Sequence, residues 1–313
     1  MPSTMDDGGA GTTTDQRVDP MVKAAADRDA GAERSEVLER RKSMSRVNSV
    51  RRHLIRAASV ALAGVFCAIA LPGSADAVVN GKNSTERYEF MASIPEIVPE
   101  LNNAEGVCGA VLVHPQWVVT AAHCVDPGNN PARPEGTVRI GSQSRTSGGT
   151  VRTIDRMVRH PGYQPGEPNK NDIALVRLDR PVAQKPIRIA DRPGKPGTPT
   201  RLMGFGTTVD TADIAKAVFP ERLQQLDTRR GAVSECSPDY ADSTRLCTIS
   251  RKRGAMACMG DSGGPQVQRG KGGRWELIGV TSGPGDDDVP CANGPGLYTS
   301  VPAYADWIHR TIR

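Results

Sequence analysis

The sequence is poor in aromatic residues. Phe, Trp and Tyr make up 4% of the 313 residues, and none of them occurs before Phe66. Lys and Arg are interspersed with Asp and Glu, so the formal charge is only +5, and no basic stripe with stacking side chains is present. Nucleic-acid binding therefore has little support.

The first part of the chain lacks the apolar side chains that a folded core needs. Residues 1 to about 50 are rich in Asp, Arg, Gly, Thr and Ser, and such a composition cannot bury enough apolar surface to offset the entropy lost on ordering. We expect residues 1–43 to be either a disordered extension or a stretch upstream of a mis-assigned start, with translation beginning at Met44.

A run long enough to span a membrane is also missing. The run from Ala57 to Leu71 has about 15 apolar residues, fewer than the roughly 20 that cross a bilayer. A basic stretch precedes it, and Ala75-Asp76-Ala77 follows it as a small-x-small site suited to signal peptidase. Residues 44–77 are therefore predicted to be a signal peptide, and the protein to be secreted to the extracellular space without a stable membrane anchor.

The cysteines lack the spacing of a zinc site. No Cys-x-x-Cys pair or Cys/His cluster occurs, so no metal is expected from them. Cys67 lies within the apolar run and would be lost with the signal peptide. The others are an even number in an exported chain, which indicates disulfides, although spacing alone would allow 15 pairings. They are Cys108, Cys124, Cys236, Cys247, Cys258 and Cys291.

From Val78 onward the chain contains a series of short β-type runs. Val, Ile, Leu and Thr recur in them, and Gly, Pro, Asn and Asp turns separate them, as in β-sandwiches and barrels. The runs are Gly109–Val113, Trp117–Thr120, Val138–Gly141, Ile173–Leu178, Leu277–Val280 and Gly296–Val301. Two stretches favour helix: residues 302–312, where Tyr304, Ile308 and Ile312 share one face, and the shorter Ala212–Val218. The fold class predicted for residues 78–313 is all-β.

One serine is set among glycines and directly follows a carboxylate. Residues 258–265 have the sequence Cys-Met-Gly-Asp-Ser-Gly-Gly-Pro, with the serine at position 262. The glycines allow tight turns that bring backbone N–H groups close to a reacting carbonyl, as a developing oxyanion requires. Ser262 is thus the candidate nucleophile, and it needs a base and a group that orients the base.

Candidates for both partners occur earlier in the chain. Among the five histidines, His123 stands at the end of an apolar β-type run and beside a cysteine, and it is the candidate base. Asp172 stands at the start of an apolar run of strand type and is the candidate orienting group.

Two other interpretations of the serine stretch compete with this one. Gly260-x-Ser262-x-Gly264 also matches the nucleophile elbow of α/β-hydrolases, with Asp286–Asp288 and His309 as formal partners. An elbow runs from strand to helix, however, and residues 265–268 continue as a strand. If it stood alone, such a stretch would be interpreted as a surface turn without function. Two further motifs accompany it, and they argue against that interpretation.

Together, the three motifs resemble those of the trypsin/chymotrypsin-like serine peptidases. They are Thr-Ala-Ala-His-Cys at 120–124, Asn-Asp-Ile-Ala-Leu at 171–175 and Gly-Asp-Ser-Gly-Gly-Pro at 260–265, in the family's order. The resemblance covers about the whole of residues 78–313, the predicted peptidase domain, and suggests a secreted bacterial-type member.

The resemblance implies an architecture and a set of disulfides. Two six-stranded Greek-key β-barrels, at about 78–185 and 195–313, would be joined through the Pro-rich run Pro181–Pro199, with a C-terminal helix and the catalytic cleft between the barrels. The implied disulfides are Cys108 with Cys124, Cys236 with Cys247, and Cys258 with Cys291.

The resemblance also assigns catalytic roles. Ser262 would attack a peptide carbonyl, His123 would accept and return the proton, and Asp172 would hold the imidazole in the right tautomer. The backbone N–H groups of Gly260 and Ser262 would meet the oxyanion.

The resemblance also gives expectations for the N-terminus of the mature enzyme and for a calcium-binding loop. Val78 stands at the family's mature N-terminus, so its α-ammonium, freed during export, is expected to pair with Asp261 and order the site. The loop Ser142–Thr150, where family members bind calcium, contains no glutamate. No metal and no cofactor are expected.

The sequence departs from the family in the substrate pocket. Six residues before the nucleophile, where trypsin-like members carry an aspartate, the chain has Met256, followed by Ala257. The pocket walls would include Ser282, Gly283 and Gly296, and Ser282 also matches a serine that supports the buried aspartate. An uncharged floor predicts apolar P1 residues, because a buried substrate cation would lack a paired carboxylate.

Residues 283–290 replace a short Trp-Gly-containing stretch of the family. Pro284 would remove an N–H that pairs with the substrate backbone, if it falls at that position. Asp286–Asp288 are expected to form a solvated acidic loop, and the alternative is that they attract basic residues of a substrate. The basic run Arg251–Arg253 would disfavour basic substrates if it lies near the pocket.

The resulting prediction is a serine endopeptidase that hydrolyses protein or peptide substrates through an acyl-enzyme. It is expected to be a monomer, with a protein inhibitor as a further partner. The alternative is a catalytically inactive binding protein on the same fold, because fold does not imply function. Hydrolysis of esters is also compatible with the same residues.

Overall fold

The computed structural model describes residues 78–128, 132–287 and 291–313. The predicted N-terminal extension and signal peptide fall outside this part of the chain. Strands dominate the described residues, which also contain the short helix α2 (Ala305–Thr311). No helix in these ranges is long and apolar enough to cross a membrane.

Six antiparallel strands form the first barrel. In sheet order they are β3 (Ala104–His114), β4 (Trp117–Thr120), β8 (Ala174–Leu178), β7 (Thr150–Arg159), β6 (Thr137–Ile140) and β2 (Met91–Val98). Because β2 also pairs with β3, the sheet closes on itself. The two-residue β5 (Arg133–Pro134) extends the sheet beside β2.

Six further antiparallel strands form the second barrel. In sheet order they are β11 (Gln224–Arg230), β10 (Pro199–Gly204), β13 (Pro265–Arg269), β14 (Trp275–Pro284), β15 (Gly296–Ser300) and β12 (Arg245–Ser250). Pairing of β11 with β12 closes this barrel. The short β1 (Lys82–Asn83) pairs with β11, and β9 (Arg188–Ile189) runs parallel to β14.

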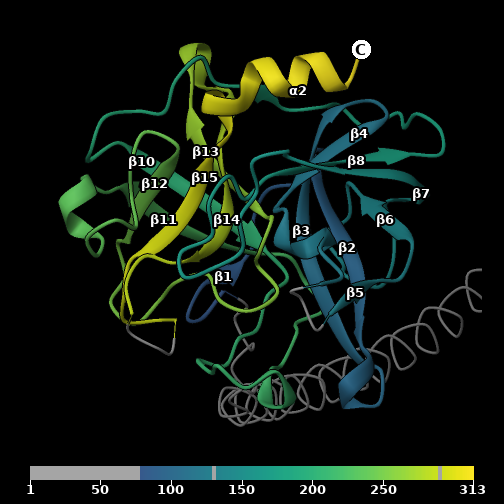
Figure 1. Ribbon diagram of the computed structural model, residues 1–313, viewed down its shortest axis with the longest axis horizontal. Coiled ribbons are helices and arrows are strands. Elements are labelled where there is room, and N and C mark those ends of the chain that lie inside the picture. Colours follow the sequence, from purple (N-terminus) through teal and green to yellow (C-terminus); the bar gives the residue numbers. More distant parts are fainter. Residues whose placement is uncertain (1–77, 129–131, 288–290) are drawn as a thin grey trace, which may run out of the picture. The chain divides into compact units, whose positions relative to one another are not determined.

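The two closed barrels confirm the predicted architecture. Figure 1 shows them side by side, the first in blue and teal and the second in green and yellow. The chain passes from one to the other between Leu178 and Pro199, within which β9 is the only regular element among the described residues. The catalytic candidates are thereby distributed over both barrels.

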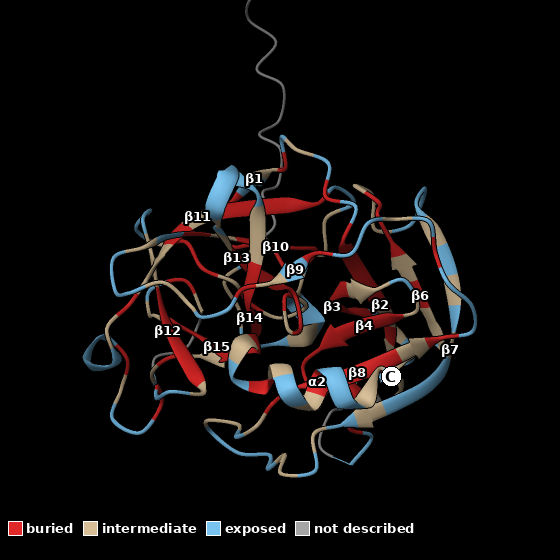
Figure 2. Cartoon of the chain, turned by 90° about the horizontal axis from the view of Figure 1, so that it is seen from above, coloured by how far each residue is buried: buried red, intermediate tan, exposed pale blue. Residues whose placement is uncertain are grey.

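The core of the first barrel is built from the apolar runs of the sequence. Val111, Val118, Leu175 and Val176 are fully buried on paired strands. Burying each such side chain contributes about 1.5–3 kcal/mol. Strand β7 differs, since none of its residues is buried, and Figure 2 shows it as a mostly exposed strand on the outside of the barrel.

The predicted C-terminal helix is present. A 3-10 turn at Val301–Tyr304 leads into α2, and Tyr304 and Ile308 are buried while Ile312 packs against the same core. This core cluster also contains first-barrel residues, so α2, at the end of the chain, packs against the first barrel.

The predicted helix at Ala212–Val218 is wrong except for a single 3-10 turn, Ile214–Lys216. Asp213 caps the turn by accepting a hydrogen bond from the Ala215 N–H. The turn stops because the Val218 N–H donates to Thr207 Oγ1 instead of to a helical carbonyl. Tertiary contacts thus override a weak local propensity.

Candidate active site

The nucleophile lies in a tight turn between β12 and β13. The Gly263 N–H donates to Thr281 O over 2.8 Å, and the Gly109 N–H of the first barrel donates to Ser262 O over 2.7 Å. Gly263 has φ of +75°, and a Cβ there would lie 2.1 Å from Thr120 Oγ1. The turn is therefore held by both barrels, and only glycine fits at its centre.

The candidate orienting group is buried at the start of β8. Asp172 is 1% exposed, and its Oδ1 accepts the backbone N–H of His123 over 2.9 Å. Its Oδ2 lies 2.8 Å from His123 Nδ1 and accepts the Ser282 hydroxyl over 2.6 Å. Burial raises the pKa of Asp172, but the charge and hydrogen bonds of His123 outweigh this, so the pKa lies below its usual value. The carboxylate is thus ionised at neutral pH.

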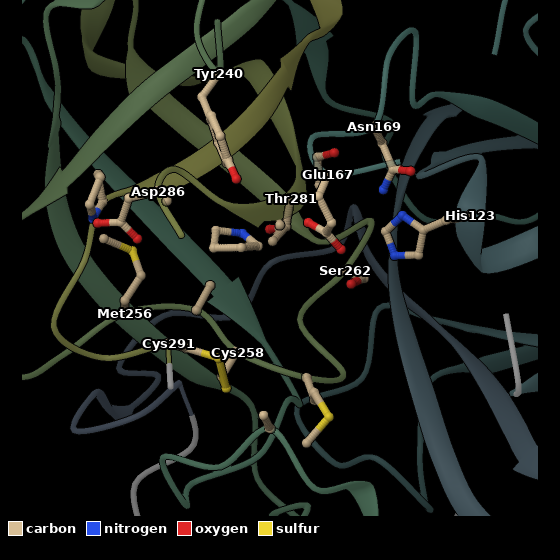
Figure 3. A pocket seen from close by; sticks show the side chains of 18 of the residues that line it. His123, Glu167, Asn169, Tyr240, Met256, Cys258, Ser262, Thr281, Asp286 and Cys291 are labelled. Atoms are coloured by element: carbon tan, nitrogen blue, oxygen red, sulfur yellow. A yellow bond between two sulfur atoms is a disulfide. The ribbon is translucent and has the colours of Figure 1, made fainter. Parts of the chain in front are cut away.

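The candidate base follows β4 in a 3-10 turn, His123–Val125. Burial lowers the pKa of His123, but the charge and hydrogen bond of Asp172 raise it more, so the net pKa lies above its usual value. Because Nδ1 faces Asp172, Nε2 is the nitrogen left for Ser262. Figure 3 shows the imidazole and the serine hydroxyl facing the same cavity.

The candidate oxyanion site is formed by backbone amides of the nucleophile turn. Gly260 has φ of +88°, and a Cβ there would lie 2.7 Å from Phe219 Cε1. The turn is shaped by other amides, with Asp261 N–H donating to Cys258 O and Gly264 N–H donating to Asp261 O. The N–H groups of Gly260 and Ser262 take no part in these backbone bonds.

A cavity of about 660 Å³ extends from the catalytic pair to Met256. Four further pocket candidates from the sequence also line it: Ala257, Ser282, Gly283 and Gly296. A Cβ at Gly296 would lie 2.9 Å from Tyr298 Cε2 and 3.0 Å from Met256 Sδ, so a larger residue would close this end of the cavity. Pro284 pairs with Gly296 across β14 and β15 and lies at the rim.

An acidic side chain lines this cavity. The sequence favoured a solvated loop for Asp286 over a role in attracting basic substrate residues, whereas the residue lines the cavity and, in Figure 3, lies next to Met256 at the end away from Ser262. Asp287 also lines the cavity and accepts the Tyr240 hydroxyl. The signals in the sequence were the acidic run itself and the inserted residues between Ser282 and Cys291.

Loop residues that carry no motif also line the cavity. Glu167 and Tyr163 come from the segment between β7 and β8 and line the cavity together with Ser262. No Lys or Arg is among the described residues that line it. Lys252, from the basic run considered above, donates instead to Asn80 O.

All six cysteines of the described residues form disulfides in the three implied pairs. Cys108–Cys124 ties β3 to the turn that carries His123. Cys258–Cys291 joins the nucleophile turn to the cavity wall, since both cysteines line the cavity. Each disulfide stabilises the fold by about 2–4 kcal/mol.

The segment Val78–Gly81 is docked against the pocket floor. Val78 is fully buried in a cluster with Met256, and Val79 forms a β-bridge with Met256. Asp261 is 1% exposed and accepts the N–H groups of Gly206 and Cys258 over 2.9 and 3.0 Å. Burial raises the pKa of Asp261 to about 7.

The loop Ser142–Thr150 is organised around a guanidinium. Arg139 donates to the carbonyls of Arg145 and Gly148 over 3.1 and 2.7 Å. The groups of the described residues that come close enough to share a metal ion all include disulfide-bonded cysteines, whose sulfurs are not thiolates.

Two closed barrels, with a serine and a histidine lining one cavity and a buried aspartate hydrogen-bonded to that histidine, define a serine protease of the chymotrypsin-like fold. Comparison with known proteins agrees, since the family model described as Trypsin matches residues 79–308. The chain therefore belongs to the trypsin family of serine proteases and is a serine-type endopeptidase.

Individual relatives are similar over most of the peptidase domain. Trypsin II-P29 from Gallus gallus is 33% identical over 256 residues, which cover 78% of this chain and 94% of that protein. Human kallikrein-5 is 35% identical over 220 residues, 66% of this chain and 68% of that protein. The structure of neuropsin, a serine protease expressed in the limbic system of mouse brain, matches with a TM-score of 0.62 at 27% identity and covers 75% of this chain and all of that one.

Proposed function

We propose that the chain hydrolyses peptide bonds through Ser262, His123 and Asp172. Ser262 Oγ attacks the carbonyl carbon and passes its proton to His123 Nε2, and the N–H groups of Gly260 and Ser262 receive the oxyanion. His123 then protonates the leaving amine, and a water molecule releases the acyl group by the same route. The observation that carries the proposal is that Asp172 fixes His123 through two hydrogen bonds beside a cavity lined by Ser262.

Labelling with a fluorophosphonate tests this proposal. The reagent should modify Ser262, should be excluded by a competing peptide substrate, and should fail when His123 is replaced by Ala, because the hydroxyl then lacks its base. Mass spectrometry locates the modified residue. A folded protein that is not labelled and does not cleave peptides would instead be an inactive binding protein.

For the primary pocket we propose uncharged, apolar P1 residues. Met256 is 1% exposed at the end of the cavity, and a substrate cation buried against its thioether would lack a paired charge. Cleavage of a mixed peptide library should therefore occur after Leu, Met, Phe or Tyr. Pro284 at the rim supports the further proposal that one backbone hydrogen bond to the substrate is absent.

A second candidate specificity is favoured by Asp286. Its carboxylate lines the cavity beside Met256, so a Lys or Arg side chain long enough to reach past Met256 would find a counter-charge there. One variant, Asp286→Asn, distinguishes the two candidate specificities. If the library profile is dominated by Lys and Arg, and Asp286→Asn abolishes that preference, Asp286 sets the specificity rather than Met256.

Secretion and activation form one further proposal. The disulfides suit an extracellular protein, and cleavage after Ala77 would give an N-terminus at Val78. We infer that the new α-ammonium pairs with Asp261, whose carboxylate is otherwise held only by backbone amides among the described residues. N-terminal sequencing of the exported protein tests the cleavage site, and export would then produce the active enzyme without a separate zymogen.

A further inference from the structure

Glu96 is a buried carboxyl that the triad does not use. It lies on β2 and is 3% exposed, and none of the described residues donates a hydrogen bond to its Oε1. Its partners across the sheet are Gly106 on β3 and Pro134 on β5. A Cβ at Gly106 would lie 3.4 Å from Glu96 Cβ, so the glycine leaves room for the acid without supplying a side-chain donor.

The position of Glu96 brings it close to the catalytic histidine. Ile94 shares the buried face of β2 with Glu96 and pairs with Cys108, whose disulfide partner directly follows His123. Strand β5, on the other side of Glu96, packs against the turn that carries His123. The charge of each side chain affects the pKa of the other, as expected for two buried groups at short range.

The charged residues of β3 and β5 nearest to Glu96 lie on the opposite face of the sheet. Glu105 on β3 and Arg133 on β5 both pair with Ile97, the neighbour of Glu96 whose side chain points to the opposite face of the sheet. Asp126, which follows the His123 turn, forms an ion pair with Arg159. His123 is thus the charge to which Glu96 responds.

We propose that Glu96 is a positioning residue for the peptidase reaction, a second carboxyl that stabilises the imidazolium of His123 in addition to Asp172. The inference rests on the proposed function of His123 as the base. When His123 accepts the proton of Ser262 it becomes a cation, and a carboxylate nearby favours that state.

The proposal predicts a distinctive pH dependence. Burial raises the pKa of Glu96 to about 8, against a smaller lowering by the charge of His123. At neutral pH the group is therefore mostly protonated and contributes no charge. As pH rises through about 8 it ionises, and its negative charge favours the protonated His123 of the transition state, so kcat/KM should rise in a second step beyond that of His123 itself. The α-ammonium beside Asp261 has the opposite effect, since its deprotonation at alkaline pH lowers activity.

The test is the pH profile of kcat/KM between pH 6 and pH 10 for the mature enzyme and its Glu96→Gln variant. The wild type should show two rising steps, and the variant should lose the second one, which amounts to about five- to twentyfold above pH 8. Near pH 7 the two should agree within about twofold. Glu96→Asp should restore a second step, which a purely structural role would not produce. Glu105→Gln, an exposed change on the neighbouring strand, is the matched control and should leave both steps in place.

An NMR titration provides a second measurement that does not depend on activity. In Ser262→Ala protein, the His123 ring protons should show a second inflection near pH 8, and the added Glu96→Gln change should remove it. A single inflection in both proteins, or two in both, would overturn the inference. Because the Ser262→Ala protein is inactive by design, this result separates failure of the Glu96 inference from failure of the proposed catalytic mechanism.

Discussion

Asp172 and Asp261 are each 1% exposed, and they differ in what faces the carboxylate. Asp172, at the start of β8, meets the imidazole of His123, whose charge lowers its pKa against the effect of burial. Asp261, in the nucleophile turn, accepts the N–H groups of Gly206 and Cys258, and burial raises its pKa to about 7.

The comparison shows that burial alone does not decide the charge of an aspartate. Burial disfavours the ionised form at both positions, and a partner that can carry positive charge reverses the outcome at one of them. For Asp172 that partner is a side chain present in every form of the chain. For Asp261 the proposed partner is the α-ammonium of Val78, which exists only after cleavage. The first aspartate is therefore a permanent part of the site and the second a conditional one.

Ser262→Ala removes the proposed nucleophile, and it should have the largest effect. We expect a loss of about 10⁶ in kcat with the fold intact, because triad residues act as a unit. Steady-state cleavage of a peptide substrate measures the loss, and near-UV circular dichroism checks the fold. Activity above a few per cent of the wild type would contradict the assignment of the nucleophile.

Asp172→Asn removes the permanent partner of His123. We expect kcat to fall by about 10⁴, as for the same change in the family's triad, because the amide favours the wrong tautomer of the imidazole. The acid limb of the pH profile should also move to lower pH, since Asp172 raises the pKa of His123 in the native protein. A loss of less than tenfold, or an unchanged acid limb, would contradict the role given to Asp172.

One extra residue before Val78 tests the conditional partner. It displaces the α-ammonium from Asp261 while leaving every side chain in place, and a misplaced active-site turn should lower kcat/KM by about 10². Asp261→Asn should give a loss of similar size, whereas an extra residue after Arg313 is the matched control and should have no effect. Full activity of the extended chain, with its extra residue confirmed by mass spectrometry, would rule out the pairing.

The smallest expected effect is on stability. In a chain that begins before Val78, the folded state holds a proton on Asp261 between about pH 4 and pH 7 that the unfolded state has lost. The free energy of unfolding should therefore fall over this range, by an amount on the order of a few kcal/mol. A chain beginning at Val78 should show a smaller fall, because its ammonium stabilises the ionised Asp261 carboxylate and only the contribution of Glu96, which is common to both chains, remains. Urea unfolding of both chains at pH 5 and pH 7.5, each carrying Ser262→Ala to prevent self-cleavage, measures the difference.

The sequence was sufficient to predict features that depend on local pattern. Short apolar runs such as Trp117–Thr120 coincide with strands. His123 and Ser262 line one cavity, and Asp172 is hydrogen-bonded to His123. Such residues lie on strands, or in turns next to strands, where neighbouring residues restrict the backbone.

Features that depend on tertiary contacts could not be predicted in this way. Asp286 lies in a stretch with no family pattern, so the sequence left open whether it enters the cavity. Glu96 alternates along β2 with partly buried residues and looks like any strand residue until its burial is known. The turn at Ile214–Lys216 is cut short by Thr207, a residue seven positions before its start.

The Gly109 N–H donates to Ser262 O, and α2 packs on the core that contains first-barrel residues. These contacts determine at what point during synthesis the chain can become active. Thr299, on the last strand, donates to the backbone carbonyl of Asp172, so the catalytic aspartate is supported by nearly the last residues to be synthesised. A nascent chain thus holds a base and its aspartate long before it holds a nucleophile in working geometry. We expect truncated copies to lack peptidase activity, because the contacts that support Asp172 and the nucleophile turn are complete only when the C-terminal residues have folded.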